Sequence, residues 1–193
     1  MGLYTPIIYK GNYIDRQKQA NIDKCVCYVE QHINAAASQA ANGAFCVVKQ
    51  QPGPISVKWA TSYVQGLTLA YPSLIKFGGP NSQGYWPGGY MGRGAGSLKY
   101  AQMPAILCEP IYITNPKHQA MLKNEADLKA LAKVLVDSIV ENFPKGGKVG
   151  LSIGHLYKTS NPYDKGAYEP AVGYEGTYCE KIINYAKELL EHA

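Results

Sequence analysis

Short apolar runs alternate along the chain with longer stretches in which apolar residues recur every three or four positions. The short runs are YTPIIY (4–9), CVCYVEQ (25–31), AFCVV (44–48), PAILCE (104–109) and KVGLSI (148–153), and each has the length of a buried strand. Helical spacing marks DRQKQANID (15–23), SVKWATSYVQGL (56–67), NEADLKALAKVLVDSIVENF (124–143) and TYCEKIINYAKELLEHA (177–193). This alternation predicts a single α/β domain over residues 1–193, with a mainly parallel twisted sheet flanked by helices on both faces.

Local signals indicate where some of these elements begin and end. Ser56 is a candidate helix N-cap, and Pro144 ends the helix predicted just before it. Residues 71–100 are too rich in glycine and proline for regular structure, and they carry several aromatic side chains. We expect this segment to be irregular and to line a binding site, with Tyr85 and Trp86 stacking on a ligand.

The composition is that of an ordinary globular protein. Of the 193 residues, 46% are apolar and 17% are charged, which excludes a disordered chain. The net charge of +5 comes from scattered Lys and Arg residues. Scattered basic residues do not indicate a dedicated nucleic-acid-binding surface. The modest positive charge is compatible with weak attraction to an anionic polymer such as a cell wall. Most of the five cysteines lie in apolar runs and are predicted to be buried free thiols; Cys108 and Cys179 adjoin acidic residues, but their apolar flanks favour packing over thiol chemistry.

The amino-terminal residues MGLYTPIIYKGNYIDR lack the basic region and long apolar stretch of a signal peptide. No apolar run approaches the ~18 residues that a membrane span needs. We therefore expect a protein that is made in the cytoplasm without a signal peptide and has no membrane span.

Polar residues follow three of the predicted strands. His32 follows CVCYVEQ, Glu109 ends PAILCE, and His155 follows KVGLSIG, while Glu180 lies near the start of the last helix. In open α/β sheets, functional groups gather beyond the carboxyl ends of the strands. His32, His155 and Glu180 can therefore form a three-ligand zinc site with an open position, and Glu109 can act as its general base.

Each of these residues also has a simpler explanation. A histidine at a strand end is more often a hydrogen-bonded structural residue than a metal ligand. Glu180 is favoured near a helix start by the helix dipole, and Glu109 can be a solvated strand end. His118 and His192 lie in a polar loop and at the chain end, and we predict both to be surface residues.

Four segments match one known family when they are taken together. SIGHLYKTSNPYDKGA (152–167) has the Gly-His and Asp-x-Gly-Ala of a first strand and its loop, and CEKIINYAKELL (179–190) has the early glutamate of the helix that follows. DRQKQANIDKCVCYVEQHINAAAS (15–38) ends in His-x-Asn-Ala, and PAILCEPIYITNP (104–116) has a strand glutamate followed by Asn-Pro. The chain thus resembles the zinc-dependent N-acetylmuramoyl-L-alanine amidases of the type 3 family, which includes bacterial autolysins and phage endolysins.

The resemblance implies a function and roles for four residues. Zinc is expected to be held by His32, His155 and Glu180, with Glu109 as the catalytic residue. The implied reaction is hydrolysis of the amide bond between N-acetylmuramic acid and L-alanine in peptidoglycan. The expected partner is therefore a muramyl peptide of the cell wall. Release through a membrane hole, as for a phage lysin, is one route to it, and use in the cytosol or export by an unconventional route stays open.

Some details depart from the family pattern or stay open. Leu156 stands where the family has a second glycine after Gly-His, and Glu169 and Glu175 are rival ligands in the loop before Glu180. Asp164 is expected to be a loop residue that can orient a histidine ligand. Two alternative functions also stay open: a peptidoglycan-binding protein without turnover, and a zinc peptidase that acts on another amide.

The order of the segments is unlike that of the family. The two segments that normally open the domain close it here, which predicts a circular permutation in which PKGGK (144–148) joins the family's usual ends. Such a rearrangement is tolerated because the termini of a compact domain usually lie close together at its surface.

Overall fold

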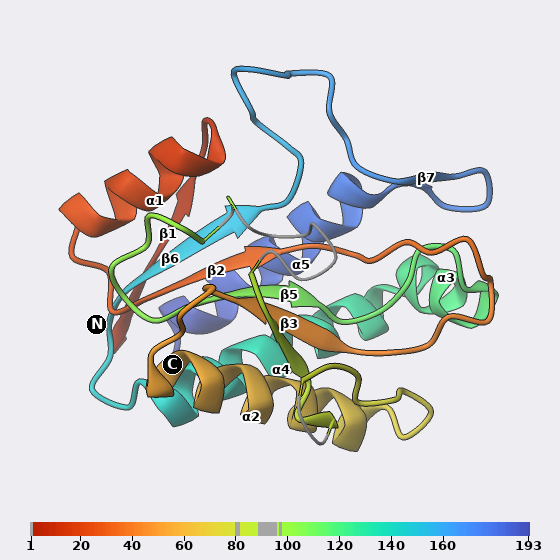
Figure 1. Ribbon diagram of the computed structural model, residues 1–193, viewed down its shortest axis with the longest axis horizontal. Coiled ribbons are helices and arrows are strands. Elements are labelled where there is room, and N and C mark those ends of the chain that lie inside the picture. The colour runs from red at the N-terminus through yellow and green to blue at the C-terminus, as the bar shows by residue number, and fades with distance from the viewer. Residues whose placement is uncertain (1, 80–81, 89–95, 97) are drawn as a thin grey trace.

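The computed structural model describes residues 2–79, 82–88, 96 and 98–193, and within them it contains a six-stranded sheet (Figure 1). The strands are β1 (Tyr4–Tyr9), β2 (Cys27–Gln31), β3 (Phe45–Val48), β4 (Tyr85–Pro87), β5 (Ala105–Glu109) and β6 (Gly147–Ile153). Their order in the sheet is β1-β6-β2-β5-β3-β4. Within the described part of this sheet, β3 and β5 are the one antiparallel pair, so the predicted mainly parallel sheet is confirmed.

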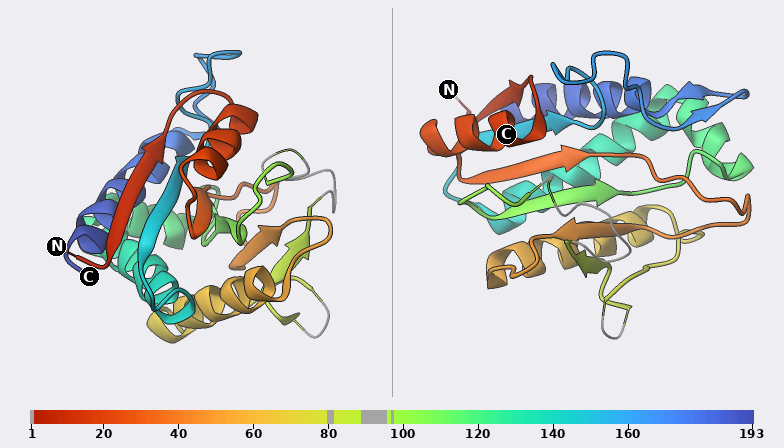
Figure 2. Two further views of the ribbon diagram at one scale, coloured as in Figure 1. Left: turned by 90° about the vertical axis from the view of Figure 1, so that its left-hand side faces the viewer. Right: turned by 45° about the horizontal axis from the view of Figure 1, so that its top comes forward.

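Helices flank both faces of this sheet, as Figure 2 shows. They are α1 (Tyr13–Ile22), α2 (Pro54–Ala70), α3 (Pro116–Lys123), α4 (Glu125–Asn142) and α5 (Glu175–Glu191). The larger hydrophobic core lies under α2, α4 and α5, and a smaller core lies on the other face beside α1. The prediction of Ser56 as N-cap is wrong: Gly53 is the N-cap of α2, and the Ser56 hydroxyl instead accepts a hydrogen bond from the Ala105 N–H.

The strands are continuously apolar because both faces of the sheet are covered. In β2, Cys27 and Val29 belong to the larger core, whereas Tyr28 belongs to the smaller one. In β5, Ile106 and Leu107 divide in the same way. Alternate side chains of a strand point to opposite faces, so a strand that is covered twice has few polar positions, and Glu30 of β2 and Ser152 of β6 are buried exceptions.

Two predicted features lie away from the sheet centre. The two ends of the chain are adjacent, since the Leu3 N–H donates to the Ala193 carbonyl at 2.9 Å (Figure 2). The described residues of segment 71–100 contribute the short strand β4, and residues 80–81, 89–95 and 97 lie outside the described part of the chain.

All five cysteines are buried free thiols, as predicted. Among the described residues, no helix combines the length and apolar character needed to cross a membrane.

Candidate metal site

His32 and His155 follow two neighbouring parallel strands and meet at one edge of the sheet. Gln31 and Ile153, the last residues of β2 and β6, are register partners. The two imidazole rings therefore come together, with centroids 4.8 Å apart and planes at 78°. On the other side of β2, Glu109 ends β5 and is 8% exposed. The positions of these residues at strand ends thus correctly predict their shared edge.

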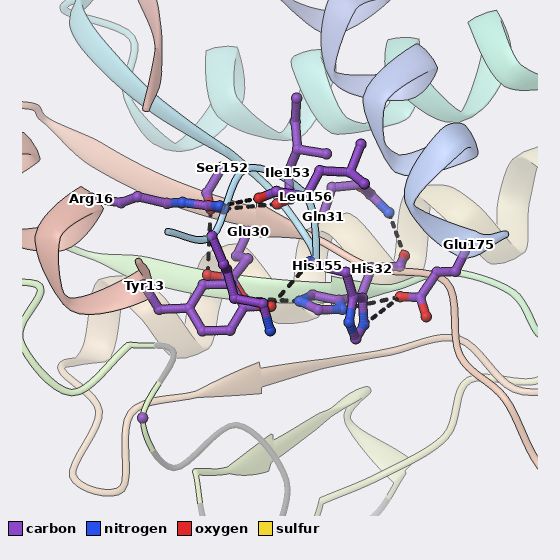
Figure 3. Close-up of polar contacts among 12 residues, drawn as sticks. Tyr13, Arg16, Glu30, Gln31, His32, Ser152, Ile153, His155, Leu156 and Glu175 are labelled. Carbon is purple, nitrogen blue, oxygen red and sulfur yellow. Dashed lines mark hydrogen bonds and ion pairs between the residues drawn. The ribbon is translucent and has the colours of Figure 1, made fainter. Parts of the chain in front are cut away.

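A glutamate completes the group, and it is Glu175. Its Oε1 lies 3.1 Å from His32 Nδ1 and 3.2 Å from His155 Nε2 (Figure 3). One ligand atom from each of the three residues lies within 4.8 Å of the other two. Two backbone N–H groups fix the carboxylate, because Ile33 donates to its Oε1 and Ala167 donates to its Oε2. We call His32, His155 and Glu175 the candidate metal site.

The structure does not place Glu180 in this group, which corrects the prediction that it is the third ligand. Glu180 instead accepts a hydrogen bond from the hydroxyl of Tyr157. Helix α5 begins at Glu175, and five residues of helix correspond to roughly 7.5 Å of rise and about 140° of rotation. The two carboxylates therefore cannot serve the same point. The other rival, Glu169, lies in a small hairpin of β7 (Tyr168–Glu169) and β8 (Gly173–Tyr174), outside the group.

The ring nitrogens that face away from Glu175 also contact carboxylates. His155 Nδ1 lies 2.9 Å from Asp164 Oδ1, which agrees with the expectation that Asp164 can orient His155. His32 Nε2 lies 2.8 Å from Glu30 Oε1. The sequence reading missed Glu30. The available signal was a carboxylate two positions before His32, directly after the apolar run CVCYV. The structure shows that the whole of β2 is buried.

Glu175 and His32 shift each other's pKa values in opposite directions. Burial raises the pKa of Glu175, but hydrogen bonds from His155 and His32 and the charges of both rings outweigh it, so that the pKa lies well below its usual value. Burial lowers the pKa of His32, but hydrogen bonds to Glu175 and Glu30, and then the charges of Glu30 and Glu109, raise it well above its usual value. The surroundings therefore favour a positive charge between these side chains.

Two glycines of the matched motifs leave room for these side chains. A Cβ on Gly154 would lie 2.5 Å from the Gln31 carbonyl oxygen and 2.7 Å from two atoms of the His32 ring. A Cβ on Gly166, which has a φ of +77°, would lie 2.6 Å from a Glu175 oxygen. The Gly-His and Asp-x-Gly-Ala spacings thus have a steric reason: a side chain at either position would displace a member of the site.

The residues present fit a zinc ion. Two imidazole nitrogens and one carboxylate oxygen are a donor set that zinc takes in catalytic sites, where a fourth position is left for water or substrate. The donors converge from a sheet edge and a helix start, and each imidazole is contacted on its far side by a carboxylate. His155 keeps 26% of its side-chain surface exposed, so the site can be reached from solvent.

One histidine prediction outside the site is wrong. His118 was expected at the surface, but it lies in α3 and is 3% exposed. Its Nδ1 accepts a hydrogen bond from the Tyr112 N–H at 3.0 Å, and burial lowers its pKa. It is a structural histidine that ties α3 to the segment after β5. His192 is exposed, as predicted.

The sequence matches a protein-family model over part of its length. Residues 9–141 match Amidase_3, the N-acetylmuramoyl-L-alanine amidase family. This range includes His32 and Glu109 and ends before β6, so His155 and Glu175 lie outside it. No curated protein matches the sequence.

Solved structures of amidases are similar to this chain. The catalytic domain of CwlV, an N-acetylmuramoyl-L-alanine amidase from Bacillus (Paenibacillus) polymyxa var. colistinus, is 23% identical with a TM-score of 0.55, over 69% of this chain and 66% of that one. The amidase from Clostridium difficile 630 is 20% identical with a TM-score of 0.56, over 69% and 66%. Ami1 from Mycobacterium smegmatis is 19% identical with a TM-score of 0.53, over 67% and 59%. The chain therefore has the amidase fold and spans just under two thirds, or less, of the length of these proteins.

Proposed function

Because the chain belongs to the N-acetylmuramoyl-L-alanine amidase family, we propose that it hydrolyses the amide bond between N-acetylmuramic acid and L-alanine in peptidoglycan. The observation that carries this proposal is the convergence of His32, His155 and Glu175 within 4.8 Å. Its substrate would be the muramyl peptide, and its place of action is the cell wall, where peptidoglycan is found.

The three side chains have separate tasks in this proposal. His32 Nδ1, His155 Nε2 and the Glu175 carboxylate hold the zinc ion. When bound, zinc supplies a Lewis acid that polarises the scissile carbonyl and makes water a better nucleophile. The backbone N–H groups of Ile33 and Ala167 keep the Glu175 carboxylate turned toward both imidazoles.

Glu109 is the proposed general base. It ends β5, the strand next to β2, and the His32 N–H donates to the carbonyl of Cys108, the residue before Glu109, so Glu109 lies at the same edge as the candidate metal site. Its carboxylate accepts a proton from the attacking water and returns it to the leaving amino group of L-alanine. Its low exposure keeps bulk water from competing for that proton.

We also propose that the chain is a circular permutation of the family. The family match stops at residue 141, whereas His155 and Glu175 come from β6 and α5 after it. The hydrogen bond between Leu3 and Ala193 places the two termini side by side. A variant with the termini joined by a short Gly-Ser linker and new ends in the turn before β6 is expected to fold and to bind zinc like the wild type. Failure of that variant to fold would contradict the proposal.

The function is tested with purified protein and two measurements, zinc content and release of peptides from peptidoglycan. Glu109→Gln keeps the shape of the side chain but cannot accept the proton, so it is expected to bind zinc normally and to release peptides 10²- to 10⁴-fold more slowly, roughly the contribution of general acid–base catalysis. Glu175→Ala is expected to lose zinc and activity together. Glu180→Gln is the matched control on the same helix and is expected to behave like the wild type.

The products distinguish the remaining alternatives. Mass spectrometry of an amidase digest shows peptides that begin with a free L-alanine and glycan strands with intact lactyl groups. Peptides cut at another amide would instead indicate a zinc peptidase. Binding to cell walls with no released peptide would indicate a binding protein, and a wild-type protein that binds no zinc would refute the zinc site itself.

A further inference from the structure

A chain of buried polar side chains runs behind His32, on the side away from Glu175. It begins at Glu30, whose Oε1 lies 2.8 Å from His32 Nε2. The Ser152 hydroxyl donates to Glu30 Oε2 at 3.4 Å, and Arg16 Nη1 donates to the Ser152 hydroxyl oxygen at 2.9 Å. Glu30, Ser152 and Arg16 are each 0% exposed (Figure 3). The proposed reaction gives none of these three residues a role.

The location of Glu30 is unfavourable unless the carboxylate has a specific task. It lies in β2, one of the inner strands of the sheet. A buried ion there lowers the stability of the fold by several kcal/mol unless it is paired and hydrogen-bonded. Register pairing places it opposite Ser152 of β6, and the Arg16 guanidinium beyond Ser152 supplies the opposite charge. An apolar residue would fit a strand of this kind more simply. Burying the Glu30 carboxylate therefore costs stability, and the buried carboxylate contacts His32.

The two ring nitrogens of His32 face different groups. Nδ1 faces Glu175 at 3.1 Å, and Nε2 faces Glu30 at 2.8 Å. A neutral imidazole carries one proton, and an ionised carboxylate can only accept it. Both carboxylates can accept this proton, but Glu30 lies closer, and Glu175 Oε1 also accepts from the Ile33 N–H and faces His155 Nε2 at 3.2 Å. The neutral ring is therefore expected to keep its proton at Nε2, with the lone pair of Nδ1 directed to the point shared with His155 and Glu175.

We propose that Glu30 is a positioning residue for His32, fixing both the tautomer and the ring orientation that metal binding at Nδ1 requires. The inference rests on the proposed zinc site and adds to it a buried support from α1 and β6. Ser152 and Arg16 hold Glu30 in turn, so that a ligand at the edge of the sheet is anchored in its interior. Partners of this kind change metal affinity by about 10- to 100-fold when they are removed.

The first test measures zinc affinity by competition with a chromophoric chelator. Glu30→Ala removes the partner of Nε2 and is expected to weaken zinc binding by about 100-fold, whereas Glu30→Gln keeps an acceptor oxygen and is expected to weaken it by about 10-fold. Glu180→Gln, a carboxylate variant outside the candidate metal site, serves as the control and is expected to bind zinc like the wild type. Equal affinities of the wild type and both Glu30 variants would overturn the inference.

The second test reads the tautomer directly and does not need the metal. Two-bond ¹H–¹⁵N correlation spectra of the zinc-free protein, recorded above the raised pKa of His32 so that the ring is neutral, are expected to show His32 mainly protonated at Nε2. In Glu30→Ala the proton is expected to move to Nδ1, because Glu175 is then the remaining carboxylate beside the ring. A single unchanged tautomer in that variant would refute the positioning role, because a residue that only supports packing would not alter it.

The two tests also separate this inference from the proposed function. A wild-type protein without zinc affinity would contradict the zinc site, while the tautomer spectra would still decide the role of Glu30. Circular dichroism and urea unfolding identify any variant that does not fold. If Glu30→Ala is unfolded, the more conservative Glu30→Gln decides the outcome through both its affinity and its spectrum.

Discussion

His32 and His155 come from neighbouring strands and contact carboxylates in the same way, yet the protein supports them differently. The His32 side chain is 10% exposed and its partner Glu30 is fully buried, whereas His155 and its partner Asp164 keep 26% and 20% of their side-chain surfaces exposed. One histidine is thus built into the sheet, and the other is held at the base of a loop.

The backbone shows the same contrast. The His32 N–H donates to the Cys108 carbonyl and continues the ladder between β2 and β5. His155 has left the sheet and has a φ of +63°, a left-handed conformation that is uncommon for residues other than glycine and is found mostly where the surroundings enforce it. Its N–H donates to the hydroxyl of Tyr13 from α1. Similar ligand chemistry is therefore reached once by strand register and once by loop contacts.

Arg16 connects the two supports. Its guanidinium donates to the Ser152 hydroxyl behind Glu30, and also to the carbonyls of Ile153 and Leu156 on either side of the Gly-His pair (Figure 3). A single buried cation thus stabilises the carboxylate behind His32 and the backbone that carries His155. The site is thus held by buried hydrogen bonds on the His32 side, where it joins the sheet, and is accessible to solvent on the His155 side.

The largest expected effect on zinc binding is at Gly154, where the two supports meet. In Gly154→Ala the new methyl would lie 2.7 Å from the His32 ring and 2.5 Å from a β2 carbonyl, so the ring or the strand pair must move. We expect loss of measurable zinc binding and a fall in the free energy of unfolding of about 1–3 kcal/mol, the usual cost of overpacking.

Chelator competition and urea unfolding measure these two effects. Gly53→Ala is the matched control, because a Cβ at Gly53 meets nothing within 4 Å. Wild-type zinc affinity in Gly154→Ala would show that the ring of His32 is not held rigidly.

The largest expected effect on stability is at Arg16. Arg16→Met removes the guanidinium beside Glu30 and leaves the Ser152 hydroxyl and two backbone carbonyls without their buried donor, which should lower the free energy of unfolding of the zinc-free protein by about 3–5 kcal/mol. Urea unfolding provides the value. Lys18→Met, an exposed position on the same helix, is the control and should change it by less than about 0.5 kcal/mol. A loss of less than about 1 kcal/mol in Arg16→Met would mean that Arg16 does not stabilise the supports behind His32 and His155.

The smallest effect is expected on the His155 side. Asp164→Asn keeps an oxygen that can accept from His155 Nδ1 and from the Gly166 N–H, and it loses only a partly exposed charge beside Lys158. Zinc affinity should fall by less than about 10-fold, and stability by no more than about 1 kcal/mol. The same two assays apply. If Asp164→Asn weakened zinc binding more than Glu30→Ala, the exposed support would be the stronger one and the comparison would be reversed.

Much of the fold was predictable because the apolar pattern is local and strong. Five short apolar runs became β1, β2, β3, β5 and β6, and the most regular helical spacing became α4. Short elements were missed where the pattern is weak. Helix α3 has eight residues, β4 has three and each strand of the β7–β8 hairpin has two, which is too short to show a clear periodicity.

The third member of the candidate metal site shows where local signals fail. Glu175 and Glu180 both lie near the start of the last helix, and the sequence favoured the one that matches the family's helix segment. The choice is made by the hairpin before α5, which starts the helix at Glu175 and turns that side chain toward the two histidines. Sequence spacing records neither the start of a helix to one residue nor the direction of its first turn.

The apolar pattern was enough to predict the α/β class and the shared sheet edge of His32, His155 and Glu109, because parallel strands bring their carboxyl ends to one edge of a sheet. Packing between distant segments selects the glutamate that joins the histidines, buries Glu30 and Arg16 behind them and places His118 inside. The two cases differ in how far apart along the chain the interacting residues lie. Strand and helix periodicity arise from neighbours in the chain, whereas the partner of a buried charge is chosen by register and packing between segments more than a hundred residues apart, as with Arg16 and Ser152.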